Sequence, residues 1–452
     1  MSIKGKIPVA ITIAGSDSGG GAGIQADLKT FAALGVHGAT AITSVTAQNT
    51  CSVEAVEDLN PETIRAQIRA VAEDLGIDAG KTGMLHTAEI IKAVASEVSK
   101  YNFPLVVDPV MVAKSGAPLL EPKAIDTFKE HMLSLATVIT PNRYEAEMLL
   151  GMEIRDLKEA ETAARKISEM GPKAVVIKGG HFKGAEAIDI LFCNGEIRKY
   201  SSPRIDVKTT HGTGCSFSAA IAAELAKGKP ISAAVEKAKK VVALGIRFGL
   251  NIGRGHGPVN PMAHLYRESL RCSVLTNIEE AKALIESSPF VMKLIPEVGM
   301  NVSMAIPYAE SIGDVAAVEG RIVKTSRGAR AVSCAKFGCS SHLAKYILEM
   351  VKHDPEKRAA INLKFLEQIL RILERRGLLI SSYDRSMEPK EIKEVEGMTI
   401  PWGVKEAIKK VGKAPDVIYH KGDVGKEPMI VIFGREAREL AELAIQIGKD
   451  VD

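Results

Sequence analysis

The sequence predicts an α/β protein in which a three-layer α/β/α domain is followed by a smaller α/β domain. The first observation is an alternation, over residues 1–265, of short apolar runs with stretches of helical period. This alternation is typical of β-α-β units around a buried parallel sheet. The second is length, since 452 residues exceed one ordinary core at roughly 100–200 residues per domain. We expect the division near residues 266–274, which gives domains of residues 1–268 and 269–452.

The alternation assigns the elements of the first domain in order. The expected strands are residues 7–14, 39–45, 105–108, 136–140 and 174–178. The helices expected between them are residues 24–34, 61–75, 88–99, 142–150 and 157–170. Two more strand-like runs flank Asn194-Gly195, a strong hairpin signal, so we expect an antiparallel excursion there. The last two helices of this domain are expected at residues 214–227 and 231–248.

The second domain gives fewer clear signals. A short helix is expected at residues 262–270, and the segment from Thr276 has capping-box spacing before a helix that ends near Glu286. Residues 315–323 and 429–433 have the apolar character of strands.

One helix of the second domain is marked at both ends. Asp354 is placed as an N-cap, Pro355 takes the first helical position, and Gly377 follows the end. Its expected apolar stripe is Leu363, Leu366, Ile369, Leu370 and Leu373.

Composition narrows the class of protein. The net charge is only +4, no half of the chain is strongly basic, and aromatic residues are 4%, so we expect no nucleic-acid partner. No run approaches the ~20 apolar residues of a membrane span, and the N-terminus does not resemble a signal peptide. The six cysteines include no Cys-x-x-Cys pair. We therefore expect a cytoplasmic protein without membrane attachment or disulfides.

A glycine-rich segment, residues 14–24, follows the first strand and includes Gly15 and Asp17. It satisfies a loose G-x-G-x-x-A pattern, but a dinucleotide site also needs an acidic residue about 20 positions further on, and residues 41–49 contain none. Two interpretations are left open. The segment is a tight structural turn, or a loop whose backbone approaches a small ligand closely.

The most informative segment is residues 208–217, which leads from an extended stretch into an alanine-rich helix. Gly212 and Gly214 allow the amides around Thr213 to turn toward one point at a helix N-terminus, where an anion is favoured. Cys215 lies in the first turn, where we expect a lowered thiol pKa and an activated base. The alternative is an inert cysteine in a glycine-bent helix start.

Charged residues follow several strands of the same domain. Lys178 ends one strand and Asp108 another, while Asn142 and Glu145 begin a helix. A lysine at a strand end can meet nucleotide phosphates in the crevice, and one or two carboxylates suit Mg²⁺ bound against phosphates. A Walker A loop is absent, so this is not a P-loop enzyme.

Nine short strings carry a family resemblance. They are residues 14–23 (AGSDSGGGAG), 24–30 (IQADLKT), 45–50 (VTAQNT), 81–85 (KTGML), 108–111 (DPVM), 114–116 (KSG), 139–142 (ITPN), 178–181 (KGGH) and 211–215 (HGTGC). With these strings in order, residues 7–261 resemble hydroxymethylpyrimidine/phosphomethylpyrimidine kinase, a ribokinase-fold enzyme of thiamine synthesis. Most sugar kinases of this fold carry Asp at the position of Cys215, so the cysteine favours the pyrimidine and pyridoxal branch.

The resemblance implies roles for individual residues. The implied pyrimidine contacts are Gln48, Met84, Val110, Gly15 and Asp17. The implied ATP contacts are Lys178, Thr213 and Asn142, and Asp108 and Glu145 would lie near Mg²⁺. Cys215 would take the hydroxymethyl proton while the amides of Gly212, Thr213 and Gly214 hold the developing charge. Two sequential phosphorylations in one pocket are compatible with these roles, because phosphoryl transfer needs positioning and charge neutralisation more than covalent chemistry.

In the second domain, the sequence signal that any single candidate residue is functional is weaker. Four cations recur at spacing three from Arg321 to Arg330, which usually marks a solvated face. His342 lies at an expected helix start with Ser340 or Ser341 as cap, and a lone histidine is more often structural. Residues 421–428 form a glycine-bent loop with two lysines, either a phosphate contact or a surface turn.

Five strings of this domain resemble an archaeal-type thiamine-phosphate synthase domain found fused to the kinase. They are residues 299–307 (GMNVSMAIP), 314–323 (DVAAVEGRIV), 337–348 (FGCSSHLAKYIL), 359–363 (AAINL) and 422–428 (GDVGKEP). The motifs that carry activity in that family map to Arg321 and His342. The implied reaction joins the pyrimidine pyrophosphate to thiazole phosphate and releases pyrophosphate, whose charge a cation cluster would stabilise.

The leading hypothesis is therefore a bifunctional enzyme of thiamine biosynthesis that uses ATP and Mg²⁺, and we also expect a homo-oligomer, a dimer or larger. Two alternatives are left open. The first is a pyridoxal-type kinase with an unrelated tail. Gln48 favours the pyrimidine over this alternative. The second is a C-terminal domain that only senses thiamine phosphates, against which the presence of Arg321 and His342 speaks.

Overall fold

The computed structural model describes residues 7–112, 116, 118–182, 184–393, 395, 397–423 and 427–451. Part of the KSG string, Lys114 and Ser115, and part of the 422–428 string lie outside the described residues. The chain divides into two compact units, Met1–Leu265 and Tyr266–Asp452. None of the described helices combines the length and the apolarity that a membrane span requires.

The first unit is built on a nine-stranded sheet. In spatial order its strands are β3 (Val53–Asp58), β2 (His37–Gln48), β1 (Val9–Asp17), β4 (Ala79–Thr82), β5 (Leu105–Val107), β6 (Val138–Ile139), β7 (Ala174–Ile177), β8 (Glu186–Cys193) and β9 (Glu196–Pro203). The six strands from β2 to β7 are parallel, and the outer strands pair antiparallel. The expected hairpin at Asn194-Gly195 is confirmed, since both residues have positive φ between β8 and β9.

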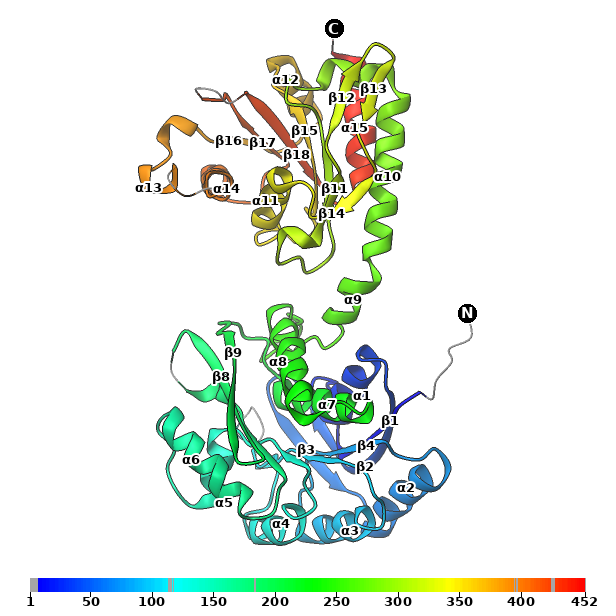
Figure 1. Cartoon of the computed structure of the whole chain (residues 1–452), viewed down its shortest axis with the longest axis vertical. Coiled ribbons are helices and arrows are strands. Elements are labelled where there is room, and N and C mark those ends of the chain that lie inside the picture. Colours follow the sequence, from blue (N-terminus) through cyan, green and yellow to red (C-terminus); the bar gives the residue numbers. More distant parts are fainter. Residues whose placement is uncertain are drawn as a thin grey trace. The chain divides into compact units, whose positions relative to one another are not determined.

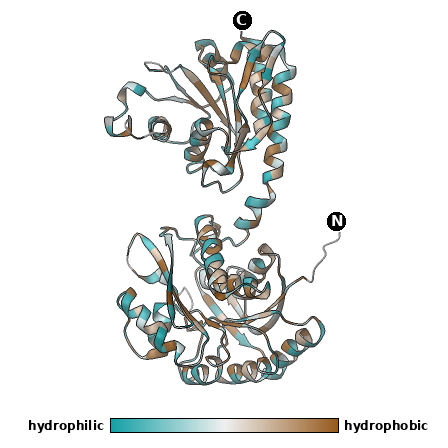
Figure 2. Cartoon of the chain, viewed as in Figure 1, coloured by the Kyte–Doolittle hydropathy of each residue, from teal (hydrophilic) through white to brown (hydrophobic). Residues whose placement is uncertain are grey.

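Helices cover both faces of this sheet (Figure 1). The helices packed on one face are α2 (Pro61–Asp74), α3 (Ala88–Val98), α4 (Ile125–Met132), α5 (Arg143–Leu150) and α6 (Leu157–Ser168). Those on the other face are α1 (Gly23–Ala33), α7 (Thr213–Ala226) and α8 (Ile231–Arg247). Two short 3₁₀ turns, η1 (Pro122–Ala124) and η2 (Gly179–His181), complete the unit. The central strands are hydrophobic, and most of the helices mix hydrophobic with hydrophilic residues (Figure 2). Because helices cover both faces of the sheet, the predicted three-layer architecture is confirmed.

The second unit contains a mostly antiparallel sheet of seven strands. In spatial order they are β14 (Ala335–Phe337), β11 (Val315–Val318), β10 (Val302–Ala305), β15 (Ala359–Lys364), β18 (Met429–Gly434), β17 (Val417–His420) and β16 (Ile380–Ser382). A separate hairpin joins β12 (Ile322–Thr325) and β13 (Gly328–Ala331). Helices α10 (Arg271–Ser287), α12 (Glu367–Arg375) and α15 (Ala437–Asp450) pack on one face, and α11 (Ser341–Met350) and α14 (Thr399–Val411) on the other. The shorter elements are α13 (Lys390–Lys393), η3 (Pro289–Leu294), η4 (Ile312–Asp314) and η5 (Arg385–Met387). Helix α9 (Ala263–Ser269) contains the boundary between the two units.

Three expectations for the second unit are wrong. Residues 354–377 do not form one helix, because strand β15 is buried between β10 and β18 and only α12 is helical. Thr276 caps nothing, since α10 already begins at Arg271. Residues 315–323 contain two strands, β11 and the start of β12, which belong to different sheets.

Candidate functional site

A cavity of about 770 Å³ lies in the first unit, at the edge of the sheet where its parallel strands end. Strands of a parallel sheet all point the same way, so the residues that follow them meet at this edge. All the residues that the sequence singled out in this unit line the cavity: Gly15, Asp17, Gln48, Met84, Asp108, Val110, Asn142, Glu145, Lys178, Gly212, Thr213, Gly214 and Cys215.

The N-terminus of α7 opens toward the cavity. Gly212 occupies its N-cap position with φ of +78°, and the helix has no side-chain cap. A Cβ at Gly212 would lie 1.9 Å from the carbonyl oxygen of Gly21, so the chain can approach the glycine-rich loop this closely only with glycine here. A Cβ at Gly214 would lie 3.3 Å from Lys178 Nζ. The helix start therefore faces the lysine, and together they form a site suited to an anion.

Lys178 is the centre of a charged cluster. Its Nζ lies 2.9 Å from Asp108 Oδ1 and 3.7 Å from Glu145 Oε2. Burial raises the pKa of Glu145 to about 7, a shift that Lys178 opposes and the charge of Asp108 reinforces. For Asp108 the cations of Lys178 and Lys81 outweigh burial, and its pKa lies below its ordinary value. One carboxylate is thus firmly ionised, while the other titrates near neutrality.

Glu145 is held by its own helix. Asn142 Oδ1 accepts a hydrogen bond from the Glu145 N–H (3.0 Å), and Glu145 Oε2 accepts one from the Asn142 N–H (2.7 Å). This is a complete capping box at the start of α5. No group of three or more His, Cys, Asp or Glu side chains arranged for a metal occurs among the described residues. Asp108 and Glu145 suit a Mg²⁺ ion completed by phosphate oxygens and water.

The pKa of the Cys215 thiol is shifted in the direction opposite to the one expected. Burial raises the pKa of its thiol to about 11, and the nearby cation of Lys81 offsets only part of that rise. The expectation of a lowered pKa was wrong because the cost of desolvating a thiolate exceeds the gain from the helix N-terminus. The residue is nevertheless only partly buried and borders the cavity, so its sulfur can serve as a base when deprotonated.

A buried ion pair beside Cys215 was missed by the sequence analysis. Lys81 Nζ lies 2.8 Å from Asp27 Oδ2, and both side chains are 0% exposed. Thr12 Oγ1 donates to the same carboxylate oxygen at 2.7 Å. Lys81 entered the sequence analysis only as the first residue of the KTGML string, and strand β4, which carries it, was not among the expected strands.

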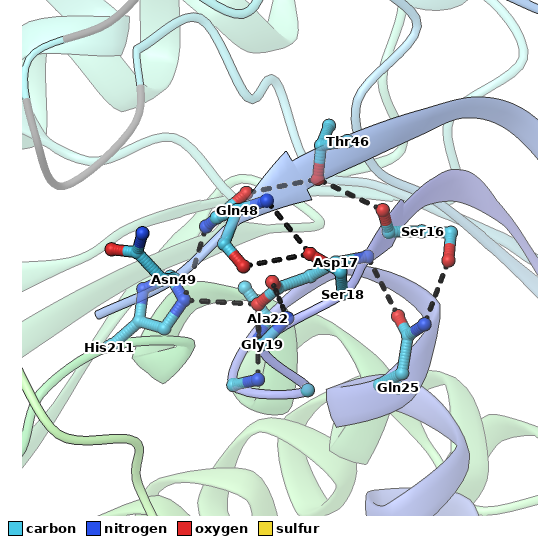
Figure 3. A network of polar contacts seen from close by, with 12 residues as sticks. Ser16, Asp17, Ser18, Gly19, Ala22, Gln25, Thr46, Gln48, Asn49 and His211 are labelled. Atoms are coloured by element: carbon cyan, nitrogen blue, oxygen red, sulfur yellow. Dashed lines mark hydrogen bonds and ion pairs between the residues drawn. The ribbon is translucent and has the colours of Figure 1, made fainter. Parts of the chain in front are cut away.

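The other end of the cavity is shaped by Gly15, Met84, Val110 and Gln48. A Cβ at Gly15 would lie 3.2 Å from Met84 Sδ, so glycine leaves room for the thioether. Asp17 is hydrogen-bonded to backbone N–H groups of the glycine-rich loop and to His211, a residue of the HGTGC string to which the sequence analysis gave no role (Figure 3).

The second unit separates its two candidate residues. Arg321 is exposed and donates from Nη1 to the Val298 carbonyl, next to a second cavity of about 640 Å³ whose lining includes Val298 and Lys364. His342 lies in the first turn of α11, where its ring packs edge-on against Tyr346 with centroids 5.5 Å apart. The four cations from Arg321 to Arg330 are all exposed, as on a solvated face.

The first unit thus has the architecture of a phosphoryl-transfer enzyme: an anion-binding helix start, a lysine and two carboxylates converge on one cavity. The model of the phosphomethylpyrimidine kinase family matches residues 17–260, more than half of the chain, and the chain belongs to this family. The family model of thiamine-phosphate synthase ThiN matches residues 277–446. The two matches together place the protein among the enzymes of thiamine biosynthesis.

Curated relatives agree with the family match. A hydroxymethylpyrimidine/phosphomethylpyrimidine kinase of Bacillus subtilis (strain 168) is 50% identical over 266 residues, which cover 58% of this chain and 98% of the relative. The thiamine biosynthesis bifunctional protein ThiED of Geobacter sulfurreducens is 47% identical over 251 residues, covering 55% of this chain. This match spans about half of that relative's length, 51%.

Solved structures confirm the ribokinase-like fold of the first unit. A pyridoxal kinase of Bacillus subtilis in complex with ADP has a TM-score of 0.54 at 40% identity, covering 57% of this chain and 98% of that one. A pyridoxal kinase of Staphylococcus aureus in complex with AMP-PCP and pyridoxal has a TM-score of 0.54 at 34% identity, covering 57% and 95%.

Proposed function

We propose that the first unit transfers phosphoryl groups from ATP to 4-amino-5-hydroxymethyl-2-methylpyrimidine and then to its monophosphate. The observation that carries this proposal is that one cavity is lined both by residues suited to a pyrimidine ring and by residues suited to phosphates. The amide of Gln48 and the side chains of Met84 and Val110 suit a flat aminopyrimidine. Lys178 and the start of α7 suit phosphates, and solved relatives bound to ADP or AMP-PCP support ATP as the donor.

In the proposed first transfer, Cys215 reacts in its thiolate form, and the hydroxymethyl proton passes to its sulfur to give the thiol. The alkoxide oxygen forms a bond to the γ-phosphorus as the bond from that phosphorus to ADP breaks, and ADP leaves. Lys178 and the amides of Gly212–Gly214 stabilise the charge on the transferring phosphoryl group. Asp108 and Glu145 would hold Mg²⁺, which neutralises phosphate charge when bound. In the second transfer the acceptor phosphate is already ionised and needs only positioning.

We propose that the second unit joins the resulting pyrimidine pyrophosphate to thiazole phosphate, with Arg321 stabilising the departing pyrophosphate and His342 contributing at the reacting end. The family match over residues 277–446 supports this. We further propose a cytoplasmic homo-oligomer, which sedimentation velocity of the full chain would test.

Phosphorus NMR of one reaction mixture tests both halves. The full chain is given the pyrimidine alcohol, Mg-ATP and thiazole phosphate, and we expect the monophosphate, the pyrophosphate and thiamine phosphate to form in that order. Arg321→Ala should abolish thiamine phosphate and leave ATP turnover within about twofold. If the wild type stops at the pyrimidine pyrophosphate, the second unit is a sensor of thiamine phosphates and not a synthase.

A second candidate activity is pyridoxal phosphorylation, because the similar solved structures include pyridoxal kinases. Comparing kcat/KM for the pyrimidine alcohol and for pyridoxal distinguishes the two. We expect the pyrimidine to be preferred, since an amide such as Gln48 pairs with an adjacent ring nitrogen and exocyclic amine. A preference for pyridoxal would contradict the proposed substrate.

A further inference from the structure

Gln48 belongs to a hydrogen-bonded chain that connects three sequence motifs (Figure 3). Its amide nitrogen faces Nε2 of His211 at 3.3 Å, and its amide oxygen faces Oγ1 of Thr46, also at 3.3 Å. His211 Nε2 in turn lies 3.1 Å from Asp17 Oδ2. All four residues line the cavity and are at most partly exposed, and Asp17 is 3% exposed.

Asp17 determines which nitrogen of His211 carries a proton. Its Oδ1 accepts from the Gly19 N–H (2.8 Å), and its Oδ2 accepts from the N–H groups of Gly21 (3.0 Å) and Ala22 (2.7 Å). Burial opposes its ionisation, but the hydrogen bonds from His211 and these amides outweigh burial, so the pKa of Asp17 lies below its ordinary value. An ionised carboxylate only accepts. Nε2 of His211 must therefore be the protonated nitrogen, whether the ring is neutral or charged.

Both neighbours of the Gln48 amide then require the same orientation. His211 Nε2–H donates toward Asp17, so it can only meet an acceptor on Gln48, which is the amide oxygen. Thr46 Oγ1 has one proton, which it donates to the Ser16 carbonyl at 3.0 Å, so toward Gln48 it can only accept. The two ends of an amide occupy the same space and are distinguished by their partners. A 180° turn puts the oxygen toward His211, where the single Nε2 proton is shared between Asp17 and Gln48 in a three-centre hydrogen bond. The same turn puts the amide nitrogen toward Thr46 Oγ1, to which it donates.

We propose that Asp17, His211 and Thr46 act as positioning residues that lock the Gln48 amide with its oxygen toward His211, so that the site accepts a flat heteroaromatic ring in one orientation only. The inference rests on the proposed pyrimidine kinase function. It requires a ring donor on the His211 side and a ring acceptor on the Thr46 side. In the aminopyrimidine these are the exocyclic amine and the adjacent ring nitrogen.

The lock also directs the reacting group. The hydroxymethyl carbon is attached next to the amine-bearing carbon, on the side away from the paired ring nitrogen. In the proposed pose the amine lies toward His211, and the hydroxymethyl group beyond it would face the residues that follow His211 in the chain and line the same cavity. Those residues are Gly212 to Cys215, the start of α7. The opposite amide orientation would turn the alcohol away from the sulfur, so the lock couples recognition to a productive pose.

The tautomer of His211 is measurable without any turnover. Long-range ¹H–¹⁵N correlation spectra of the full chain, labelled at histidine, should show a proton on Nε2 of His211. The signal is assigned by its loss in His211→Leu. A His211 protonated on Nδ1 alone would overturn the proposal. This measurement stands even if the pyrimidine alcohol proves not to be the substrate, so the two failures are distinguishable.

Specificity provides the second test. The 4-oxo analogue, 5-hydroxymethyl-2-methylpyrimidin-4-one, presents an acceptor where the substrate has its amine and a donor on the ring nitrogen. Wild type should prefer the amino substrate in kcat/KM by ~100-fold or more, because the locked amide leaves buried polar groups unpaired. In the double variant Thr46→Val, His211→Leu the amide is free to turn, and the preference should fall below about tenfold.

A matched control separates this effect from general damage. His37→Leu removes an exposed histidine from the same strand, β2, and should leave the preference unchanged. A merely structural role for His211 and Thr46 would lower both kcat/KM values together and preserve their ratio. An unchanged ratio in the double variant would therefore overturn the proposal, and a collapsed ratio supports it. The single variants each retain one constraint and should give intermediate ratios.

Discussion

The two units place their candidate residues in different ways. In the first unit, residues from strands far apart in sequence, such as Asp17, Asp108 and Lys178, line one cavity. In the second unit, Arg321 follows the carboxyl end of β11, whereas the chain approaches His342 from Phe337, which pairs near the opposite end of that strand. The difference follows from strand direction. Parallel strands send all their carboxyl ends to one edge, but antiparallel strands distribute theirs between two edges.

The largest effect is expected from removing the base Cys215, a change that should impair the first unit and leave the second unit active. Cys215→Ala should lower kcat for pyrimidine phosphorylation by ~10³-fold, because a positioned base contributes roughly 10²–10⁴-fold. The second unit should still convert added pyrimidine pyrophosphate and thiazole phosphate at the wild-type rate, which phosphorus NMR would follow. Equal loss of both activities would contradict independent sites, and an unchanged kinase rate would remove Cys215 from the mechanism.

The pKa of the same thiol predicts that the pH dependence of kinase kcat/KM differs between the wild type and Cys215→Asp. With a pKa of about 11, the thiolate fraction rises tenfold per pH unit throughout the neutral range. Kinase kcat/KM should therefore rise by ~100-fold from pH 7 to pH 9 where proton transfer limits the rate. Cys215→Asp supplies a stronger acid that is already ionised, and should flatten the profile. A flat wild-type profile would show that the sulfur is not the limiting base.

The sequence predicted the parallel half of the molecule better than the antiparallel half for a physical reason. Alternating buried strands and amphipathic helices carry their own signal, and motifs after parallel strands converge without further information. The periodicity argument failed at strand β15, because Leu363 lies in this buried strand but falls by chance in the same helical period as Ile369 and Leu373 of the following helix.

Residue chemistry was predictable only where local sequence determines it. The capping box of Asn142 and Glu145 is a local feature, whereas the acidity of Cys215 depends on burial and on Lys81, which comes from another strand. The contact between His211 and Asp17 joins residues 194 positions apart. Such pairs come together only through the fold, so no spacing rule in the sequence could have identified them.

Two glycines with the same backbone angle provide a smaller comparison. Gly212 and Gly338 both have φ of +78°, but a Cβ would lie 1.9 Å from the Gly21 carbonyl oxygen in the first case and 3.9 Å from its nearest neighbour in the second. Gly338→Ala should cost only the backbone strain, about 1 kcal/mol. Gly212→Ala should lower the free energy of unfolding by about 3 kcal/mol, because the loop must also move. Urea unfolding measures both, by circular dichroism for the whole chain and by Trp402 fluorescence for the second unit.

The smallest expected effect compares two helix starts. Asn60 caps α2, its side chain accepting from the Glu62 N–H at 2.8 Å, whereas Ser340 occupies the N-cap of α11 without a side-chain cap hydrogen bond. Asn60→Ala should therefore cost about 1 kcal/mol of unfolding free energy, and Ser340→Ala less than about 0.3 kcal/mol. Equal costs in urea unfolding would mean that Ser340 does cap α11 in solution. Because α11 carries His342 in its first turn, such a cap would fix the histidine's backbone, and the second unit would then be more preorganised than its scattered candidate residues indicate.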